Sequence, residues 1–409
     1  MRQVELLIPA GSLEVLKVAV DYGADAVYIG GEHFGLRAKA HNFTIEDMRE
    51  AVAYCHERNV KLYVTANIFA HNDDLDGVRT YFESLKSVGI DALIISDPAI
   101  FMLAKEILPE VELHVSTQAN NTNYGIYQFW HTLGAKRVVS ARELSLREIK
   151  EIRENIPEDM EIESFVHGAM CISYSGRCLL SHFLTGRDAN QGACTHPCRW
   201  KYSVVEEKRP GEYFPVEEDD RGTYIFNSKD LCMVEHIPEL IDAGIDSFKI
   251  EGRMKTALYV ATVARTYRKA IDDFMKGPEV YRSNLSYYKE EIGKCTYRQF
   301  TTGFYFGKTD SDSQVYDNNQ YVKDYTYIGK VEAVSEDGCV HFVQRNKFCV
   351  GEKVEAMLFD GTNQMLTVNK IFNERMEEVD SAPHPKEHLV VDLGEALPVG
   401  TIIRRQSVE

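Results

Sequence analysis

Five of the nine cysteines in this 409-residue chain fall between positions 171 and 232. Their spacing is C-x6-C-x15-C-x3-C-x33-C, made by Cys171, Cys178, Cys194, Cys198 and Cys232. Thiolates gathered in this way are typical of a metal centre, an iron–sulfur cluster or a redox site. Structural zinc usually has two close cysteine pairs, and only Cys194/Cys198 approaches one, whereas iron–sulfur ligation tolerates irregular spacing. The spacing therefore favours a cluster over zinc.

Two alternatives compete with a metal site at these cysteines. Reduced thiols packed as small hydrophobic residues suit Cys55, Cys295, Cys339 and Cys349, but five of them in one polar segment would be an unusual packing choice. A disulfide framework is disfavoured, because nine is an odd number and no signal peptide is visible after Met1. No apolar run approaches the length of a membrane span. We therefore expect a cytoplasmic protein with reduced thiols and no membrane partner.

The composition is that of a globular protein, with 44% hydrophobic and 11% aromatic residues. The formal net charge of −17 works against non-specific nucleic-acid binding, so an RNA partner would need a local basic face. Lys255, Arg265, Arg268 and Lys269 lie on one predicted helix and are the candidates for that face. An ordinary solvated helix surface is the alternative for each of them.

A short pattern recurs in the first part of the chain: a glycine follows a helical segment, and an apolar run of strand length comes next. Such runs, alternating with helical stretches, predict parallel βα units, and eight of them fit a TIM-like (β/α)8 barrel. The predicted strands are Glu5–Ile8, Ala26–Ile29, Lys61–Val64, Ala92–Ile95, Glu112–Val115, Arg137–Val139, Glu161–Phe165 and Ser247–Ile250. A ninth candidate, Thr223–Asn227, is assigned to an insertion between the seventh and eighth strands. A doubly wound open sheet is the alternative, but the turn at 9–12 does not match G-x-G-x-x-G.

The hydrophobic period changes toward the carboxyl end, where short β-rich segments separated by turn residues predict a small antiparallel β-barrel or sandwich. These segments are Tyr325–Val334, Cys339–Arg345, Lys353–Phe359, Gln364–Ile371, His388–Asp392 and Thr401–Arg405. We therefore divide the chain into a barrel at 1–277 with an insertion at about 168–232, a connector at 278–322, and a small β-barrel domain at 323–409. Acidic residues outnumber basic ones in the last domain, which favours a stabilising or partner-docking role over RNA binding.

In a barrel of this kind, chemistry belongs at the carboxyl ends of the strands. Of the polar residues there, Gln118, Arg142, His167 and Arg253 stand out because each can bind a planar or anionic group. Arg253 also precedes a predicted helix start, where N–H groups attract carboxylate or phosphate. The alternative is that these loops are polar only because they face solvent. Familiar patterns are missing: there is no H-E-x-x-H or G-x-S-x-G, and 303–309 is one residue short of a P-loop.

The strongest sequence pattern begins at the predicted seventh strand. It reads Glu163-x-Phe165-x2-Gly168-Ala169-Met170-Cys171-x4-Gly176-x-Cys178-x-Leu180-Ser181. This segment resembles the signature of the collagenase-like peptidase family U32. Leu7-Pro9-Ala10-Gly11, Ser116-Thr117-Gln118 and Lys249-Ile250-Glu251-Gly252-Arg253 also resemble blocks of that family, so the resemblance covers essentially the whole chain.

The resemblance implies an activity that the family name does not describe. Better-understood relatives are oxygen-independent hydroxylation factors that carry a 4Fe–4S cluster on four cysteines of this region. By position, the implied metal ligands are Cys171, Cys178, Cys194 and Cys232, with Cys198 as a substitute for Cys194. In length and in its β tail the chain is most similar to the branch that makes 5-hydroxyuridine at the tRNA wobble position, with prephenate as co-substrate and hydroxyl source.

The polar residues at the predicted strand ends suggest how such a donor would be bound. We expect Arg142, Lys249 and Arg253 to bind the carboxylates of the small dicarboxylate donor, and tRNA to be the macromolecular partner. The candidate catalytic residues are His167, Gln118 and Glu251. Two other functions remain open: a collagenase-like peptidase, which rests on the family name, and a non-catalytic maturation partner that acts through the β domain.

Overall fold

A computed structural model describes most of the chain, and its contacts divide it into two compact units. The described residues are 3–32, 34–35, 42–171, 178–187, 189, 193–200, 203–205, 213–215, 229–307 and 322–407. The barrel unit comprises Met1–Lys17, Asp25–Met254 and Arg298–Gln320, and the second unit comprises Val18–Ala24, Lys255–Tyr297 and Tyr321–Glu409. Within the residues described, no helix is both long and apolar enough to cross a membrane.

Eight parallel strands form a closed ring in the barrel unit, which confirms the predicted TIM-like fold. They are β1 (Glu5–Pro9), β2 (Ala26–Gly30), β3 (Lys61–Ala66), β4 (Ala92–Ile95), β5 (Glu112–Val115), β6 (Arg137–Val139), β7 (Glu161–Ala169) and β11 (Ser247–Ile250). Each strand pairs with the next, and β11 closes the ring by pairing with both β7 and β1. Four predicted strands have the bounds observed, and the other four extend further toward their carboxyl ends.

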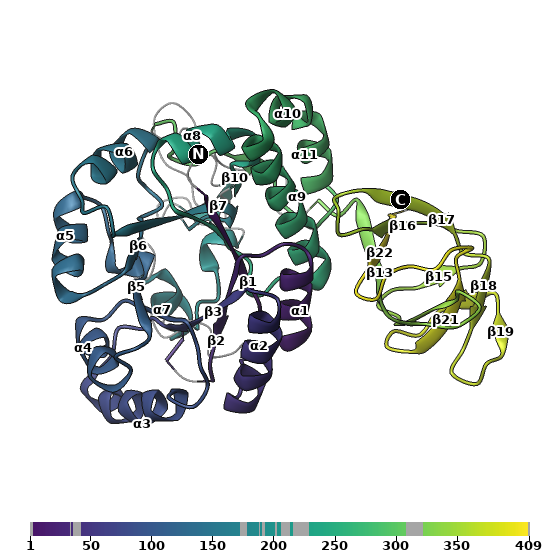
Figure 1. Cartoon of the computed structure of the whole chain (residues 1–409), viewed down its shortest axis with the longest axis horizontal. Helices are drawn as coiled ribbons and strands as arrows, with labels where there is room; N and C mark the ends of the chain where they lie inside the picture. The colour runs from purple at the N-terminus through teal and green to yellow at the C-terminus, as the bar shows by residue number, and fades with distance from the viewer. Residues whose placement is uncertain are drawn as a thin grey trace. The chain divides into compact units, whose positions relative to one another are not determined.

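Helices alternate with these strands along the chain and surround them (Figure 1). They are α1 (Leu13–Asp21), α2 (Ile45–Glu57), α3 (Leu75–Leu85), α4 (Pro98–Ile107), α5 (Tyr124–Leu133), α6 (Leu146–Glu154) and α8 (Ile237–Asp242). Their ends follow from local sequence. Asn123 caps the start of α5 by accepting a hydrogen bond from the Ile126 N–H, and Gly134 ends it in a left-handed conformation with φ of +98°. The predicted glycine-then-strand pattern therefore marks real helix ends.

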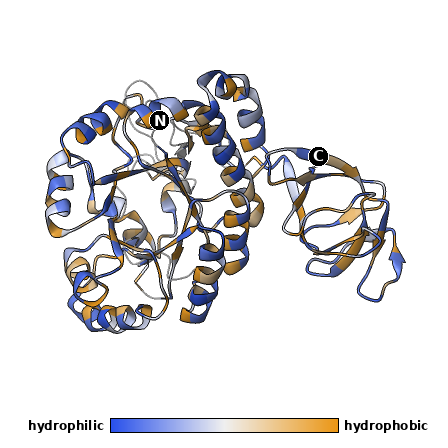
Figure 2. Ribbon diagram, in the orientation of Figure 1, coloured by the Kyte–Doolittle hydropathy of each residue, from blue (hydrophilic) through white to orange (hydrophobic). Residues whose placement is uncertain are grey.

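The barrel strands are buried on both faces because helices cover the outside and side chains fill the inside. All five residues of β2 are buried, for example. Leu7, Tyr28, Tyr63 and Ile94 belong to one buried cluster contributed by four neighbouring strands. Figure 2 shows the corresponding concentration of hydrophobic residues along these strands. The barrel is thus a packed core whose open chemistry lies at its ends.

The insertion after β7 returns to the barrel through a strand that the sequence did not predict. β10 (Asp230–Cys232) pairs antiparallel with the extended end of β7, and β12 (Phe300–Thr301) pairs parallel with β10. Between β7 and β10 the described residues include α7 (Leu180–Thr185) and a hairpin of β8 (Ser203–Val205) and β9 (Tyr213–Pro215). The predicted strand Thr223–Asn227 lies outside the described residues.

The second unit contains helices and an antiparallel sheet. Its helices are α9 (Ala257–Lys276), α10 (Pro278–Ser283) and α11 (Leu285–Ile292). Its larger sheet runs in the order β17 (Asn363–Thr367), β16 (Lys353–Met357), β22 (Ile402–Gln406), β13 (Tyr325–Val334), β14 (Val340–Val343), β21 (His388–Asp392), β18 (Lys370–Phe372) and β19 (Glu378–Val379). A separate pair joins β15 (Phe348–Cys349) to β20 (Ser381–Ala382). The antiparallel prediction is confirmed, but the predicted strand Gln364–Ile371 is wrong, because β17 and β18 are separate strands.

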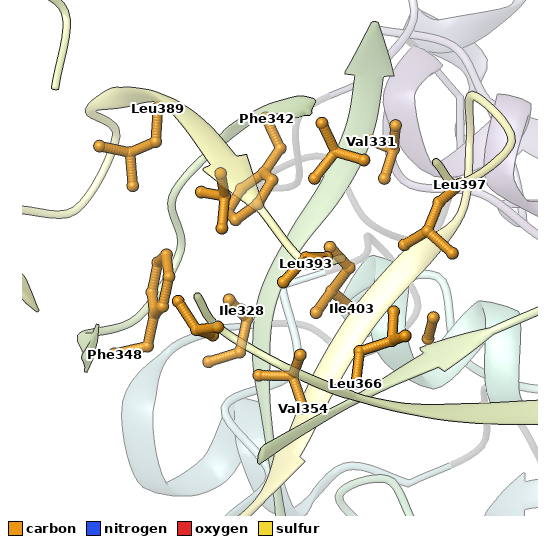
Figure 3. Packing of buried hydrophobic residues seen from close by; sticks show 14 of the residues in the cluster. Ile328, Val331, Phe342, Phe348, Val354, Leu366, Leu389, Leu393, Leu397 and Ile403 are labelled. Atoms are coloured by element: carbon orange, nitrogen blue, oxygen red, sulfur yellow. The ribbon is translucent and has the colours of Figure 1, made fainter. Parts of the chain in front are cut away.

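A single cluster of buried side chains forms the core of this antiparallel sheet. Phe342, Leu393 and Ile403 lie near one another within it (Figure 3). The helices α9 to α11 group with the sheet rather than with the barrel. Our division at 277 and 322, made from sequence, had placed them in the barrel and the connector.

Candidate active site

A row of polar residues follows three neighbouring barrel strands at their carboxyl ends. Ala66, Ile95 and Val115 are in register across β3, β4 and β5. The next residues along these strands are Asn67, Ser96 and Ser116. Ser96 Oγ donates to the Asn67 carbonyl at 3.1 Å, and Asn67 Nδ2 lies 3.5 Å from Ser116 Oγ. The row is therefore held together by its own contacts.

Gln118 extends this row from a short 3-10 turn after β5. The turn is Thr117–Ala119, capped by Ser116 Oγ, which accepts from the Gln118 N–H at 3.4 Å. Gln118 is only 6% exposed, yet its Oε1 has no hydrogen-bond partner among the described residues. Asn67 Oδ1 is likewise buried and has no hydrogen-bond partner among the described residues. Buried acceptors without partners are uncommon in folded proteins, so this part of the mouth is suited to a ligand that donates hydrogen bonds.

Arg253 lies beside this row, on the β2–β3 side of the mouth. Its Nη1 donates to Thr65 Oγ1 at 2.9 Å, and the side chain is almost fully buried. A Cβ at Gly30 would come within 2.6 Å of the guanidinium, so the absence of a side chain at the end of β2 makes room for it. The structure adds Gly30 and Thr65, which support the guanidinium, and the anion-binding role of Arg253 stays a prediction.

Arg142 lies over the β7 side of the mouth. Its guanidinium stacks on the Phe165 ring at 3.9 Å, Nη1 donates to the Ala169 carbonyl at 2.8 Å, and Nη2 contacts Glu251 at 3.2 Å. Arg142 Nε is buried without a hydrogen-bond partner in the described part of the chain. Two of the predicted site residues, Arg142 and Glu251, therefore pair with each other. A substrate carboxylate would have to share or displace Glu251.

Lys249 lies deeper, inside the barrel. Its Nζ contacts Glu163 at 2.6 Å, and it lies over the Tyr28 ring at 4.4 Å and the Phe165 ring at 5.5 Å. Both Lys249 and Glu163 are buried. The lysine that sequence placed on a substrate carboxylate thus has a protein carboxylate as its partner. That pair was missed because the two residues are 86 positions apart.

His167 and Cys232 are brought together by β10. The antiparallel register places Cys232 opposite His167, and Leu231 opposite Gly168. His167 is 1% exposed, and its ring centroid lies 5.7 Å from that of Phe300 on β12. β10 therefore places Cys232, the last cysteine of the group, opposite a residue near the carboxyl end of β7. That residue, His167, lies two positions before the strand ends at Ala169.

The other cysteines lie just beyond β7, in the insertion. Cys171 and Cys194 are exposed, Cys178 and Cys198 are half-buried, and none of the nine cysteines, all of which are described, forms a disulfide. Burial raises the pKa of the Cys194 thiol, and the neighbouring Cys171 and Cys178 raise it further. The disulfide alternative is wrong.

The donor set suits an iron–sulfur cluster in its chemistry, because cysteine thiolates are the ligands that such clusters use. In the described ranges no group of three or more His, Cys, Asp or Glu side chains converges closely enough to hold a metal ion. Residues 172–177 and 190–192, between the cysteines, lie outside those ranges. The five cysteines themselves are described, and they do not converge in this structure, so the ligand assignment stays a prediction.

A basic RNA face on α9 was predicted from four cations, and the structure contradicts it at Arg265. That residue is 2% exposed, and its guanidinium contacts Glu291 at 2.7 Å and Asn363 at 2.7 Å. Arg268 and Lys269 each pair with an aspartate four residues further along the helix. The prediction failed because helical spacing does not reveal whether a polar face meets solvent or acidic partners.

A surface hollow of about 660 Å³ lies elsewhere, between α3 and α4. Arg79, Met102 and Glu106 are among the residues that line it, and Arg79 already pairs with Glu106 at 2.9 Å. It includes none of the predicted site residues. We therefore place the candidate site at the strand ends and in the adjoining cysteine segment.

The chain matches the models of two known protein families. The model of Peptidase family U32 matches residues 11–315, and that of the Peptidase family U32 C-terminal domain matches residues 323–404. The chain belongs to peptidase family U32. The resemblance read from the sequence is thereby confirmed, and both the barrel and the antiparallel sheet of this U32 protein fall within the matched residues.

Relatives of this U32 protein match it over nearly their whole length. It is 42% identical over 402 residues to tRNA hydroxylation protein P1 of Bacillus subtilis, covering 98% of this chain and 94% of that protein. It is 39% identical to tRNA hydroxylation protein P of Escherichia coli, with 93% and 91% covered. A protein of Porphyromonas gingivalis named Collagenase is 33% identical, with 91% and 90% covered.

Proposed function

We propose that this protein hydroxylates tRNA, converting the wobble uridine to 5-hydroxyuridine with prephenate as the hydroxyl donor. The observation that carries the proposal is the match to tRNA hydroxylation proteins over more than nine-tenths of this chain and of theirs. A match of that extent includes the cysteine segment and the strand ends together. The position on the tRNA and the donor go beyond the names of those relatives and come from the resemblance read in the sequence.

In this proposal Cys171, Cys178, Cys194 and Cys232 hold a 4Fe–4S cluster, with Cys198 as a substitute for Cys194. Support comes from the thiolate chemistry of the segment that follows β7 and from the register that sets Cys232 opposite His167, near the end of the same strand. When bound, such a cluster supplies one-electron redox chemistry and Lewis acidity next to the barrel mouth. The cytoplasm, where thiols stay reduced, is the compartment that suits it.

The residues of the barrel mouth bind and orient the substrates. Arg253, supported by Thr65, and Arg142, supported by Phe165, are the groups for the two carboxylates of the donor. Glu251 holds Arg142 in place until a carboxylate arrives. Lys249 remains paired with Glu163 deeper in the barrel, where it lies over the same Phe165 ring on which Arg142 stacks. His167, enclosed beside Cys232, is the group placed to hold or move a proton.

A peptidase is the second candidate, because one relative with 90% of its length covered is named Collagenase. The two candidates differ in what they require from the cysteines. A peptidase needs no cluster, whereas the hydroxylation proposal fails without one. Purification without oxygen, followed by iron and sulfide analysis, therefore separates them. A colourless, iron-free protein that cleaves gelatin would establish the peptidase.

Single cysteine substitutions test the hydroxylation proposal most directly. Cys171→Ala and Cys178→Ala should remove the absorption at about 400 nm that iron–sulfur clusters show, and should abolish tRNA modification at the same time. Absorption spectra of the anaerobic proteins and mass spectrometry of tRNA nucleosides from complemented deletion strains measure both effects. Cys339→Ala, on a half-buried cysteine of the second unit, is the matched control and should change neither. An equal loss in the control would overturn the ligand assignment.

A further inference from the structure

The mouth of the barrel has two chemically different halves. Arg253 and Arg142 place guanidinium groups over the β2–β3 side and the β7 side. Beyond β3, β4 and β5 the polar row instead carries the amides of Asn67 and Gln118, and one oxygen of each is buried without a partner among the described residues. A cationic half suits carboxylates. A half that offers bare carbonyl oxygens repels carboxylates and needs a hydrogen-bond donor.

Ser116 fixes the position of the amide half. Its Oγ lies 3.4 Å from the backbone nitrogen of Gln118 and 3.5 Å from the side-chain Nδ2 of Asn67. One hydroxyl therefore contacts both of the residues that carry side-chain amides. Ser116 and Gln118 are both more than nine-tenths buried. Asn67 follows the same strand as Thr65, which supports Arg253. The two halves of the mouth therefore adjoin each other at the end of β3.

The chemistry of the amide half matches the edge of a uracil ring. The N3–H of uracil is a donor flanked by two carbonyl acceptors, and a carboxamide presents an acceptor beside an N–H donor. A side-chain amide can therefore accept from N3–H and donate to the neighbouring carbonyl in one plane. The dicarboxylate donor offers no such pattern, because its ionised carboxylates only accept and its hydroxyl is a lone donor with no carbonyl acceptor on either side.

We propose that Gln118 recognises the target base by accepting the N3–H of uracil at Oε1. Asn67 supplies a second acceptor for an N–H or O–H of the same nucleoside, while Ser116 contacts the Asn67 side-chain amide and the backbone N–H of Gln118. This inference rests on the proposed function, since it takes uridine as the substrate, and it assigns base recognition to Gln118, which the sequence had suggested as a candidate catalytic residue. A base without an N3–H would leave the buried Gln118 Oε1 without a hydrogen bond. Binding of such a base is therefore disfavoured, and a single hydrogen bond discriminates between bases.

The test compares two RNA stem-loops that carry either uridine or N3-methyluridine at the target position. The full-length protein, purified without oxygen, should bind the uridine RNA about 10- to 100-fold more tightly, measured by fluorescence anisotropy. Gln118→Leu and Gln118→Met should bind both RNAs with the weaker affinity. Gln128→Leu is the matched control, because that glutamine lies exposed on α5 and its amide donates to the Asn155 carbonyl. It should keep the discrimination.

Equal binding of the two RNAs by the unmodified protein, or discrimination that survives in both Gln118 variants, would overturn the assignment. Hydroxylation of cellular tRNA is scored separately, by nucleoside mass spectrometry. Hydroxylation without discrimination would reject the role of Gln118 and leave the proposed function standing. No hydroxylation by the unmodified protein would reject the proposed function, and uracil as the ligand with it.

Discussion

The two ends of the barrel differ in how far their buried polar groups are paired. At the end where the strands begin, Arg137 Nε donates to Glu161 at 2.8 Å, and its Nη groups contact Glu5 at 3.1 Å and Glu163 at 3.2 Å. Tyr63 donates to Glu5 at 2.6 Å. Buried charges are costly unless paired, and here the pairing forms one network across β1, β3, β6 and β7.

At the end where the strands finish, polar atoms of the described residues are left without partners. They include Gln118 Oε1, Asn67 Oδ1 and Arg142 Nε. The first end is not perfectly satisfied, because His114 Nδ1 also has no partner there, but burial lowers the pKa of that ring and keeps it neutral. The contrast indicates that the charges at the first end stabilise the fold, whereas those at the second end are kept for ligands.

Removing Arg137 should produce the largest change in stability. Arg137→Met leaves Glu5, Glu161 and Glu163 without their shared cation, and a buried pair broken in this way costs about 3–5 kcal/mol in the free energy of unfolding. Urea titration followed by the fluorescence of Trp130, which is buried in the barrel unit, measures it. Arg79→Met, on an exposed pair with Glu106, is the control and should change little. Equal effects from the two substitutions would remove the contrast between the barrel ends.

Acid should weaken the same end of the barrel. Burial opposes ionisation of Glu5, but the Arg137 guanidinium and hydrogen bonds from Arg137, Tyr63 and Ser247 outweigh it and lower the pKa to about 2 from 4.5. A carboxyl with a depressed folded-state pKa stabilises the fold fully above its unfolded value. This contribution, about 3 kcal/mol, is therefore lost as the pH falls from 4.5 toward 2.

Subtracting a matched variant isolates this effect from other carboxyls. The free energy of unfolding, measured between pH 5 and pH 3, should fall more steeply for the unmodified protein than for Glu5→Gln, which has no proton to gain. Parallel slopes for the two proteins would show that Glu5 is not held ionised by Arg137.

The contrast between the barrel ends also explains what sequence could predict. Apolar runs such as Ala92–Ile95 are local signals, and they predicted the eight strands because a buried parallel strand needs little else. Residues at the strand ends, such as Arg253 and Gln118, could be named because the fold assigns that end to chemistry. Local sequence patterns were therefore enough to predict features that follow from general rules of the barrel fold.

Partnerships over long sequence distances could not be predicted in this way. Lys249 and Glu163 meet only because β11 pairs with β7. β10 has three residues and no period, so nothing local indicated that Cys232 would lie opposite His167. Arg265 was misread for the same reason, since its acidic partner Glu291 belongs to another helix. Each failure concerns a polar residue whose partner is fixed by tertiary structure.

The smallest expected stability change belongs to the open end. Gly30→Ala would place a Cβ within 2.6 Å of the Arg253 guanidinium, so the side chain must leave its position on Thr65. The free energy of unfolding should fall by only about 1 kcal/mol, because the far end of a flexible side chain can move aside. The Michaelis constant for the dicarboxylate donor should nevertheless rise about tenfold, since the proposed contact between the Arg253 guanidinium and a donor carboxylate is lost.

Gly125→Ala provides the control for this last substitution. Gly125 lies in α5, where alanine favours the helix and the nearest outside atom, Asn123 Oδ1, would be 3.2 Å from the new Cβ. The Michaelis constant should not change there; because Asn123 Oδ1 also caps α5, only the Michaelis constant serves as the control. If Gly30→Ala instead destabilised the barrel as strongly as Arg137→Met while leaving the Michaelis constant unchanged, Arg253 would be a structural residue. The carboxyl ends of β2 and β3 would then serve the fold in the same way as the end where the strands begin.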